Sequence, residues 1–190
     1  GTRELVLDTR DLVIEKIESD GKDLPFRLDS SVEFLGQALH IPVSGQTGSV
    51  SIHYHTLPKA AALQWLQPDQ TAGKQSPFLF SQSQAILART WVPIQDSPGI
   101  RFTYDAIIRV PKGMLALMSA ENPVKQSSDG VYKFTMKQPV PAYLLALAVG
   151  DLQFHAFDGR CGVYAEPTMM DKSIHEFTEL PAMIGAAEKL

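Results

Sequence analysis

Apolar residues recur at every second position in several parts of this chain, and this alternation constrains the fold more than any other feature. Over residues 101–110, apolar side chains at even positions alternate with mostly polar side chains at odd positions. Successive side chains of an extended strand point to opposite faces, so the pattern predicts strands with one buried face. The strands expected on this ground cover residues 49–55, 101–110, 132–137 and 151–156, and the apolar residues 5–7 are expected to begin a further strand.

Turn-forming residues separate these predicted strands. Asp20-Gly21, Ser44-Gly45 and Ser128-Asp129-Gly130 have the composition of hairpin turns or short loops. Many short strands at this spacing favour an antiparallel sandwich or curved, layered sheets, so the predicted fold class is mainly β. The apolar run 143–149 lacks alternation, and it predicts a strand covered on both faces.

The period changes after Glu166-Pro167. Apolar residues then recur at steps of three and four, which predicts a helix with one apolar face from about Asp171 onward. Asp171 or Ser173 has the right chemistry to cap it, and Pro181 is expected to kink it. A helix after an all-β region predicts a domain boundary near residues 157–160. The apolar positions are Ile174, Phe177, Leu180, Ile184 and Ala187.

Composition excludes several classes of partner. The 190 residues carry 17 Lys and Arg against 21 Asp and Glu, with the basic residues scattered, so no nucleic-acid partner is expected. The longest apolar run, 142–150, is too short to span a bilayer, so we expect no membrane partner. A single cysteine excludes an internal disulfide and is compatible with a cytoplasmic location. Because a strand begins at residue 5, we expect earlier strands, and any signal peptide, to be missing, which leaves a periplasmic or secreted location open.

The segment that follows residue 77 carries the clearest candidate for molecular recognition. Phe78, Phe80, Gln82 and Gln84 share one parity, so two aromatic rings and two carboxamides can point the same way. A carboxamide offers donors and acceptors without charge, which suits binding of a peptide backbone or a free amino group. The alternative is that the glutamines are only the solvated side of a strand, and spacing alone does not separate the two.

Four segments together resemble a known family. In order along the chain they read QWLQPDQTAGKQSPFLFSQSQAI, WVPIQDSP, LALMSA and VPAYLLALAVG. They are similar to the leukotriene A4 hydrolase branch of the M1 zinc aminopeptidases. The resemblance implies a saddle-like, antiparallel, multi-sheet N-terminal β domain over residues 1–157. It also implies that residues 158–190 are the first strand and helix of a thermolysin-like α/β catalytic domain.

The resemblance also implies roles for two residues. Gln84 aligns with a position that grips the free α-amino group of a peptide substrate, which is Glu in most M1 aminopeptidases and Gln in this branch. Gln82 aligns with a second contact to the substrate. Replacing Glu by Gln removes an ion pair with the ammonium group but keeps an acceptor. The implied partners are a peptide substrate and the remainder of the chain's own catalytic domain.

The zinc site that the family needs is not recognisable in this sequence. A thermolysin-like site uses H-E-x-x-H on a helix plus a further Glu, and the nearest match, residues 175–179, ends in Glu. We therefore expect zinc in the full-length protein and no catalytic or metal-binding residue in this chain. His53 and His55 lie two apart and could face a metal, but an exposed strand face is the simpler reading. Cys161 is expected to be a small core residue, and Asp96 a structural turn residue.

Two functions from different classes remain open at this point. The chain is either the N-terminal fragment of a zinc metallo-aminopeptidase, inactive by itself, or a standalone β-rich binding module without catalysis. An H-E-x-x-H motif beyond residue 190 would favour the first. A chain that ends there would favour the second.

Overall fold

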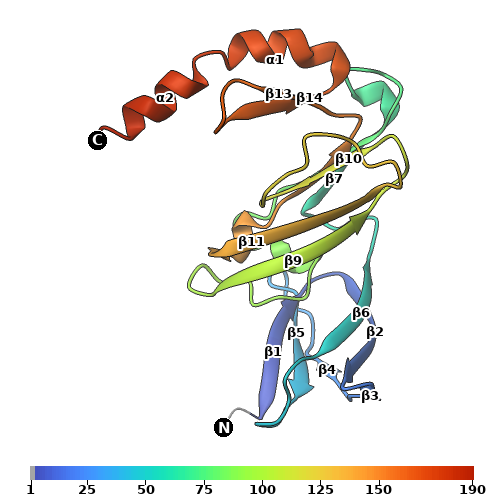
Figure 1. Ribbon diagram of the computed structural model, residues 1–190. Coiled ribbons are helices and arrows are strands. Elements are labelled where there is room, and N and C mark those ends of the chain that lie inside the picture. Colours follow the sequence, from blue (N-terminus) through green and yellow to red (C-terminus); the bar gives the residue numbers. More distant parts are fainter. Residues whose placement is uncertain (1–2) are drawn as a thin grey trace. The chain divides into compact units, whose positions relative to one another are not determined.

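The computed structural model describes residues 3–190, and over this range the protein is mainly β with two α helices near its C-terminal end (Figure 1). The mainly β fold class expected from the alternation is confirmed. The chain divides into two compact units, each built from several stretches of sequence. The first comprises Gly1–Gln64, Ser81–Thr103 and Lys137–Ala146, and the second comprises Trp65–Phe80, Tyr104–Met136 and Leu147–Leu190.

Two antiparallel three-stranded sheets form most of the first unit. One has the order β1–β5–β4 and the other the order β3–β2–β6. Leu7 of β1 lies opposite Leu39 of β5, so these apolar residues occupy one face of the first sheet. The strands are β1 (Glu4–Thr9), β2 (Leu12–Ser19), β3 (Lys22–Asp23), β4 (Arg27–Leu28), β5 (Gln37–Pro42) and β6 (Ser51–Thr56).

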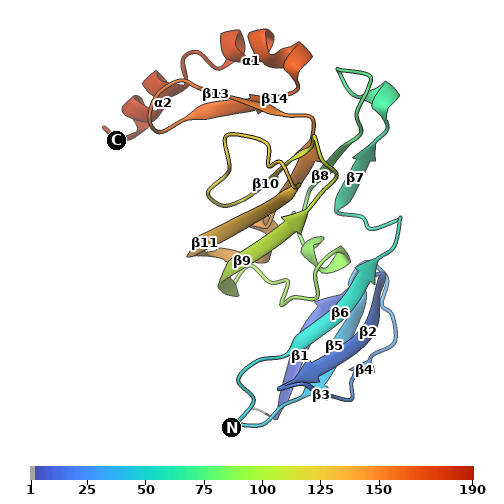
Figure 2. The ribbon, with the colours of Figure 1, turned by 45° about the vertical axis from the view of Figure 1, so that its right-hand side comes forward.

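The two sheets pack around a small apolar core. Ile17 of β2 and Leu39 and Ile41 of β5 are almost completely buried and form one cluster. Apolar residues of β1 and β6 pack against the same cluster, so both sheets bury one face as the alternation predicts. Figure 2 shows these strands together at the blue end of the chain.

The predicted hairpin turn at Asp20-Gly21 is confirmed. Both residues adopt positive φ angles, 51° for Asp20 and 73° for Gly21, and they connect Ser19 to its partner Lys22. A two-residue loop with φ positive at both positions matches the right-handed twist of the strands it joins. Asp and Gly are among the residues that adopt this conformation most readily.

A four-stranded sheet with the order β10–β12–β8–β7 and a two-stranded ladder of β9 and β11 follow. Burial alternates along the whole of β9, with odd-numbered residues exposed and even-numbered residues half-buried, as the sequence predicts. The strands are β7 (Leu63–Leu66), β8 (Phe78–Ser81), β9 (Arg101–Arg109), β10 (Leu115–Met118), β11 (Val131–Pro141) and β12 (Leu147–Gly150).

The apolar run 143–149 does not form the single strand that its composition predicts. Residues Ala142–Leu144 form a short 3-10 helix, β12 begins only at Leu147, and the Leu144 side chain is 48% exposed. Pro141 is the last residue of β11 and also the N-terminal cap of this 3-10 helix. The extended conformation is therefore interrupted within a run that remains apolar.

The C-terminal part of the second unit is a hairpin with helices. Strands β13 (Gln153–Ala156) and β14 (Gly162–Ala165) pair antiparallel, and helix α1 (Met170–Glu176) packs on this hairpin (Figure 1). Helix α2 (Leu180–Ala187) follows after a turn. The division of the chain into residues 1–157 and 158–190 stays a prediction.

The single kinked helix expected from Asp171 onward is wrong in two respects. Phe177 ends α1, and Pro181 lies in the first turn of α2 rather than in a helix interior. Proline is tolerated there because first-turn amides have no intrahelical partner. The capping prediction also fails, since α1 begins after Met169 and no side chain caps it.

A histidine in the first sheet makes the stability of this unit depend on pH. His40 Nδ1 lies 3.0 Å from Glu4 Oε2, and its Nε2 lies 2.9 Å from Asp29 Oδ2. The Glu4 carboxylate, followed by that of Asp29, raises the pKa of His40 above its usual value. A raised pKa in the folded state stabilises the protein below the unfolded pKa of about 6.5, and this stabilisation is lost as the pH rises through the folded value.

We therefore expect the melting temperature of the protein to fall between about pH 6 and about pH 8, and to fall less in the variant His40→Gln. Thermal melts of both proteins across this range make the measurement. Equal slopes in the two proteins would show that His40 does not contribute.

Candidate functional site

Gln82 and Gln84 project into solvent from the loop that follows β8. Both are exposed, whereas Leu79 and Ser83, on the other parity, are 8% and 2% exposed. The alternation that predicted an outward-facing pair of carboxamides is therefore present in the structure. Phe80 is also exposed and Phe78 is half-buried.

The two carboxamides are not equivalent. The Gln84 backbone N–H donates to Gln82 Oε1 at 3.0 Å, so this oxygen is already engaged. The amino group of the Gln82 carboxamide and both ends of the Gln84 carboxamide have no side-chain or backbone partner within residues 3–190. Gln82 therefore offers donors to a ligand, and Gln84 offers donors and an acceptor.

Backbone and buried side-chain bonds hold this segment in place. The Gln82 N–H donates to the Ala62 carbonyl at 2.8 Å. The Ser83 hydroxyl donates to the Leu145 carbonyl at 2.8 Å and accepts from Trp91 Nε1 at 3.1 Å. Gln82 and Gln84 are thus exposed polar groups on a firmly attached backbone, an arrangement suited to binding a polar ligand.

A buried ion pair between Arg89 and Asp96 lies in the stretch that follows this segment. Arg89 and Asp96 are 6% and 4% exposed, and Asp96 Oδ2 accepts from both the backbone N–H and the Nε of Arg89 at 3.1 Å. Arg89 Nη2 donates to the Asp96 carbonyl and Nη1 to the Leu35 carbonyl. The Asp8 carboxylate lies 3.4 Å from Arg89 Nη1, so each of the three guanidinium nitrogens has at least one acceptor nearby.

The predicted structural role of Asp96 fits these bonds, but its partner was not foreseen. Sequence reasoning missed Arg89, Ser83 and the indole N–H of Trp91. A charged residue within the mostly apolar run 85–92 was the available signal for Arg89, because a buried charge needs a partner. For Ser83 the signal was its position between two glutamines expected to face solvent, which places its own side chain on the inward face.

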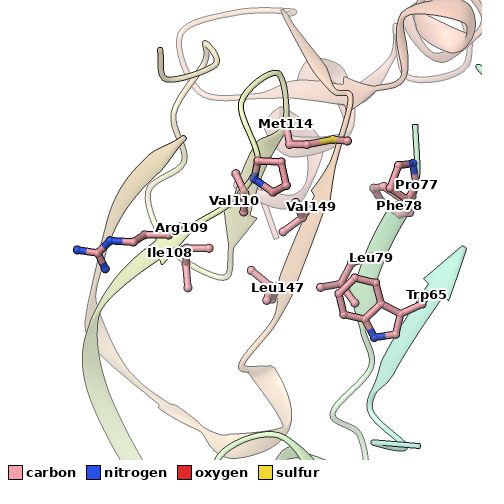
Figure 3. Close-up of a pocket in the computed structure, with 11 residues that line it drawn as sticks. Trp65, Pro77, Phe78, Leu79, Ile108, Arg109, Val110, Met114, Leu147 and Val149 are labelled. Carbon is pink, nitrogen blue, oxygen red and sulfur yellow. The ribbon is translucent and has the colours of Figure 1, made fainter. Parts of the chain in front are cut away.

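A separate cavity of about 250 Å³ lies in the second unit. Figure 3 shows Trp65, Leu79, Leu147 and Val149 around it, while the Arg109 side chain points away. Apart from Arg109, the lining residues carry none of the acidic, basic or nucleophilic side chains that a catalytic site requires.

Other candidates are engaged locally. His53 and His55 are exposed, and each contacts a different carboxylate, Glu18 at 2.9 Å and Glu15 at 2.7 Å. Within residues 3–190, no three His, Cys, Asp or Glu side chains form a group that could hold a metal ion. His175 and Glu176 are exposed helix positions.

Cys161 is half-buried in the loop between β13 and β14 and is not a core residue. Burial, together with the neighbouring Asp158 carboxylate, raises the pKa of the Cys161 thiol. The thiol therefore stays protonated near neutral pH.

Comparison with known proteins identifies the family. Residues 1–144 match the peptidase M1 N-terminal domain. The chain belongs to the M1 peptidase family. It is 42% identical to leukotriene A-4 hydrolase of Xenopus laevis, across 98% of this chain and 32% of that protein. It is 40% identical to leucine aminopeptidase 2 of Yarrowia lipolytica, across 99% of this chain and 29% of that protein.

A solved structure of yeast leukotriene A4 hydrolase in complex with bestatin has the same fold. It superimposes with a TM-score of 0.88 at 34% identity, across 98% of this chain and 29% of that chain. This M1 chain therefore spans about a third of the length of the relatives it matches. Among residues 3–190, neither helix has the length and apolar character needed to cross a membrane.

The Arg89–Asp96 pair gives a stability prediction for this M1 domain. We expect Asp96→Asn to destabilise the protein by about 3–5 kcal/mol, because it leaves the buried Arg89 charge without its main partner. Lys59→Gln is the matched control, since Lys59 is 69% exposed and pairs with Asp11 at 3.1 Å. Its expected effect is below about 1 kcal/mol. Denaturant unfolding measures both, and similar small effects would contradict the prediction.

Proposed function

We propose that the full-length protein is a zinc aminopeptidase that removes N-terminal residues from peptides. In this proposal the present chain supplies Gln82 and Gln84 to recognise the substrate. The observation that supports these roles is the pair of exposed carboxamides with unpartnered groups, held on a fixed backbone in a chain of the M1 family. Residues 158–190 are proposed to begin the catalytic domain.

The chemistry of the two carboxamides matches the N-terminal end of a peptide. The Gln84 carbonyl oxygen can accept a hydrogen bond from the substrate's α-ammonium group. The Gln82 side-chain oxygen already accepts from the Gln84 backbone N–H, but the amino group of the same carboxamide can donate to a substrate carbonyl. Neither carboxamide can take up or release a proton in the physiological range, so the pair binds the substrate and does not act as general acid or base.

The residues described here do not fit a catalytic zinc site. Two imidazoles and a carboxylate would have to meet at one point, and residues 3–190 hold no such group. The zinc proposed for the full-length protein therefore depends on residues outside this chain. No step of the reaction is assigned to the residues present.

Replacing Gln84 tests the recognition role. We expect Gln84→Ala in the full-length protein to raise KM for dipeptides, and the inhibition constant of bestatin, by about tenfold, because a hydrogen bond to a charged group is lost. Gln84→Glu should lower KM for the same substrates by adding an ion pair. Steady-state kinetics with each variant provide the values.

Gln46→Ala is the matched control for Gln84→Ala, because Gln46 is an exposed glutamine on the loop between β5 and β6. Its kinetics should equal those of the parent protein. Parent-like kinetics for Gln84→Ala as well would mean that Gln84 is only a solvated surface residue.

The proposal also predicts the metal content of the chain. Residues 1–190 produced alone and dialysed should retain well below one equivalent of zinc and should not cleave aminoacyl anilides, because the ligands lie elsewhere. Metal analysis of the purified chain measures its zinc content. One equivalent of tightly bound zinc would show that residues of this chain form a metal site.

A further inference from the structure

The Ser83 side chain lies between the two recognition glutamines and points the opposite way. It is 2% exposed, and its hydroxyl makes two bonds, donating to the Leu145 carbonyl at 2.8 Å and accepting from Trp91 Nε1 at 3.1 Å. A serine hydroxyl has one hydrogen to donate, so its donor capacity is fully used and its rotamer is fixed from two directions. Leu145 lies 62 residues further along the chain, so the first bond is a tertiary contact.

Fixing Ser83 also fixes its neighbours. Ser83 points inward while Gln82 and Gln84, on either side of it, are exposed, so an anchor at Ser83 fixes the backbone from which both carboxamides project. The backbone supports this orientation on both sides, because the Gln82 N–H donates to the Ala62 carbonyl and the Ser83 carbonyl accepts from the Leu87 N–H at 2.9 Å. Without the hydroxyl, these backbone bonds remain but the inward anchor between them is lost.

Trp91 is itself held in position. Its side chain is buried, and its backbone carbonyl accepts a hydrogen bond from the Tyr54 hydroxyl of β6 at 3.0 Å. Burial raises the pKa of the Tyr54 phenol, so this donor keeps its proton under ordinary conditions. A continuous series of bonds therefore runs from β6 through Trp91 and Ser83 to Leu145.

We propose that Ser83, oriented by Trp91, is a positioning residue that sets the direction of the Gln82 and Gln84 carboxamides and so determines affinity for the substrate's N-terminal end. This inference rests on the proposed function of the two glutamines. Ser83 does not touch the substrate and acts only through its neighbours.

A purely structural role would give a different result from a positioning role. If Ser83 is only structural, its substitution lowers the melting temperature and the fraction of active protein, but KM of the correctly folded molecules stays unchanged. If Ser83 is a positioning residue, its substitution raises KM, because the substrate is bound less well in both the ground state and the transition state. The value of kcat per active site then stays the same.

The test uses the full-length enzyme and peptide substrates with a free amino terminus. Ser83→Ala should raise KM by about threefold to tenfold, the equivalent of one hydrogen bond, with kcat per active site within about twofold. Trp91→Phe, which keeps an aromatic ring but removes the N–H donor, should raise KM in the same direction. Thr9→Val is the matched control, since Thr9 is another 2% exposed hydroxyl, bound to the Gln37 carbonyl. It should lower the melting temperature and leave KM unchanged.

The decisive measurement repeats Ser83→Ala in the background Gln82→Ala/Gln84→Ala. If Ser83 acts through the glutamines, its effect on KM disappears there. An equal increase of KM in both backgrounds, or no increase in the parent, would overturn the inference while the proposed function stands. If Gln84→Ala alone leaves KM unchanged, the proposed function itself fails.

Discussion

The buried ion pair between Arg89 and Asp96 is the constraint on which the arrangement of residues 89–96, just after the exposed Gln82 and Gln84, depends. Moving two charges out of water is expensive, so such a pair is tolerated only when hydrogen bonds at the guanidinium nitrogens compensate for the lost water. Here Asp96 accepts from Arg89 Nε through its carboxylate and from Nη2 through its backbone carbonyl. The Leu35 carbonyl accepts from Nη1. Satisfying one arginine therefore fixes the stretch 89–96 and the loop at Leu35, which lies 54 residues away in sequence.

The need of Arg89 for acceptors also links residues 89–96 to strand β1. Asp8 of β1 presents its carboxylate to Arg89 Nη1 and also accepts the Asp96 N–H at 2.9 Å. Asp8 and Ile94 exchange two backbone hydrogen bonds, so the segment becomes an extension of the β1 ladder. The loop bearing Gln82 and Gln84 is thus followed by a stretch that is bonded to β1 through both backbone and side-chain groups.

Local rules were sufficient for β9 and the Asp20-Gly21 turn, and insufficient for the apolar run 143–149, the C-terminal helices and the site. The alternation of β9 and the Asp20-Gly21 turn follow from side-chain parity and from positive φ angles, which neighbouring residues determine. The break at Leu144 and the turn after Phe177 depend on how Pro141 and Pro181 are used, and a proline permits either outcome. The anchoring of Ser83 could not be predicted, because Leu145 reaches it only through tertiary folding.

The contrast between Ser83 and its neighbours shows how the direction of exposed, uncharged side chains can be specified. A buried hydroxyl that lacks partners destabilises the folded state, so Ser83 has one stable orientation. Apart from the bond between the Gln84 N–H and Gln82 Oε1, neither exposed carboxamide has a partner among residues 3–190. The direction in which Gln82 and Gln84 point is therefore inherited from the buried residue between them. Because neither carboxamide titrates, binding through this pair would follow the ionisation of the substrate's amino group and not that of the protein.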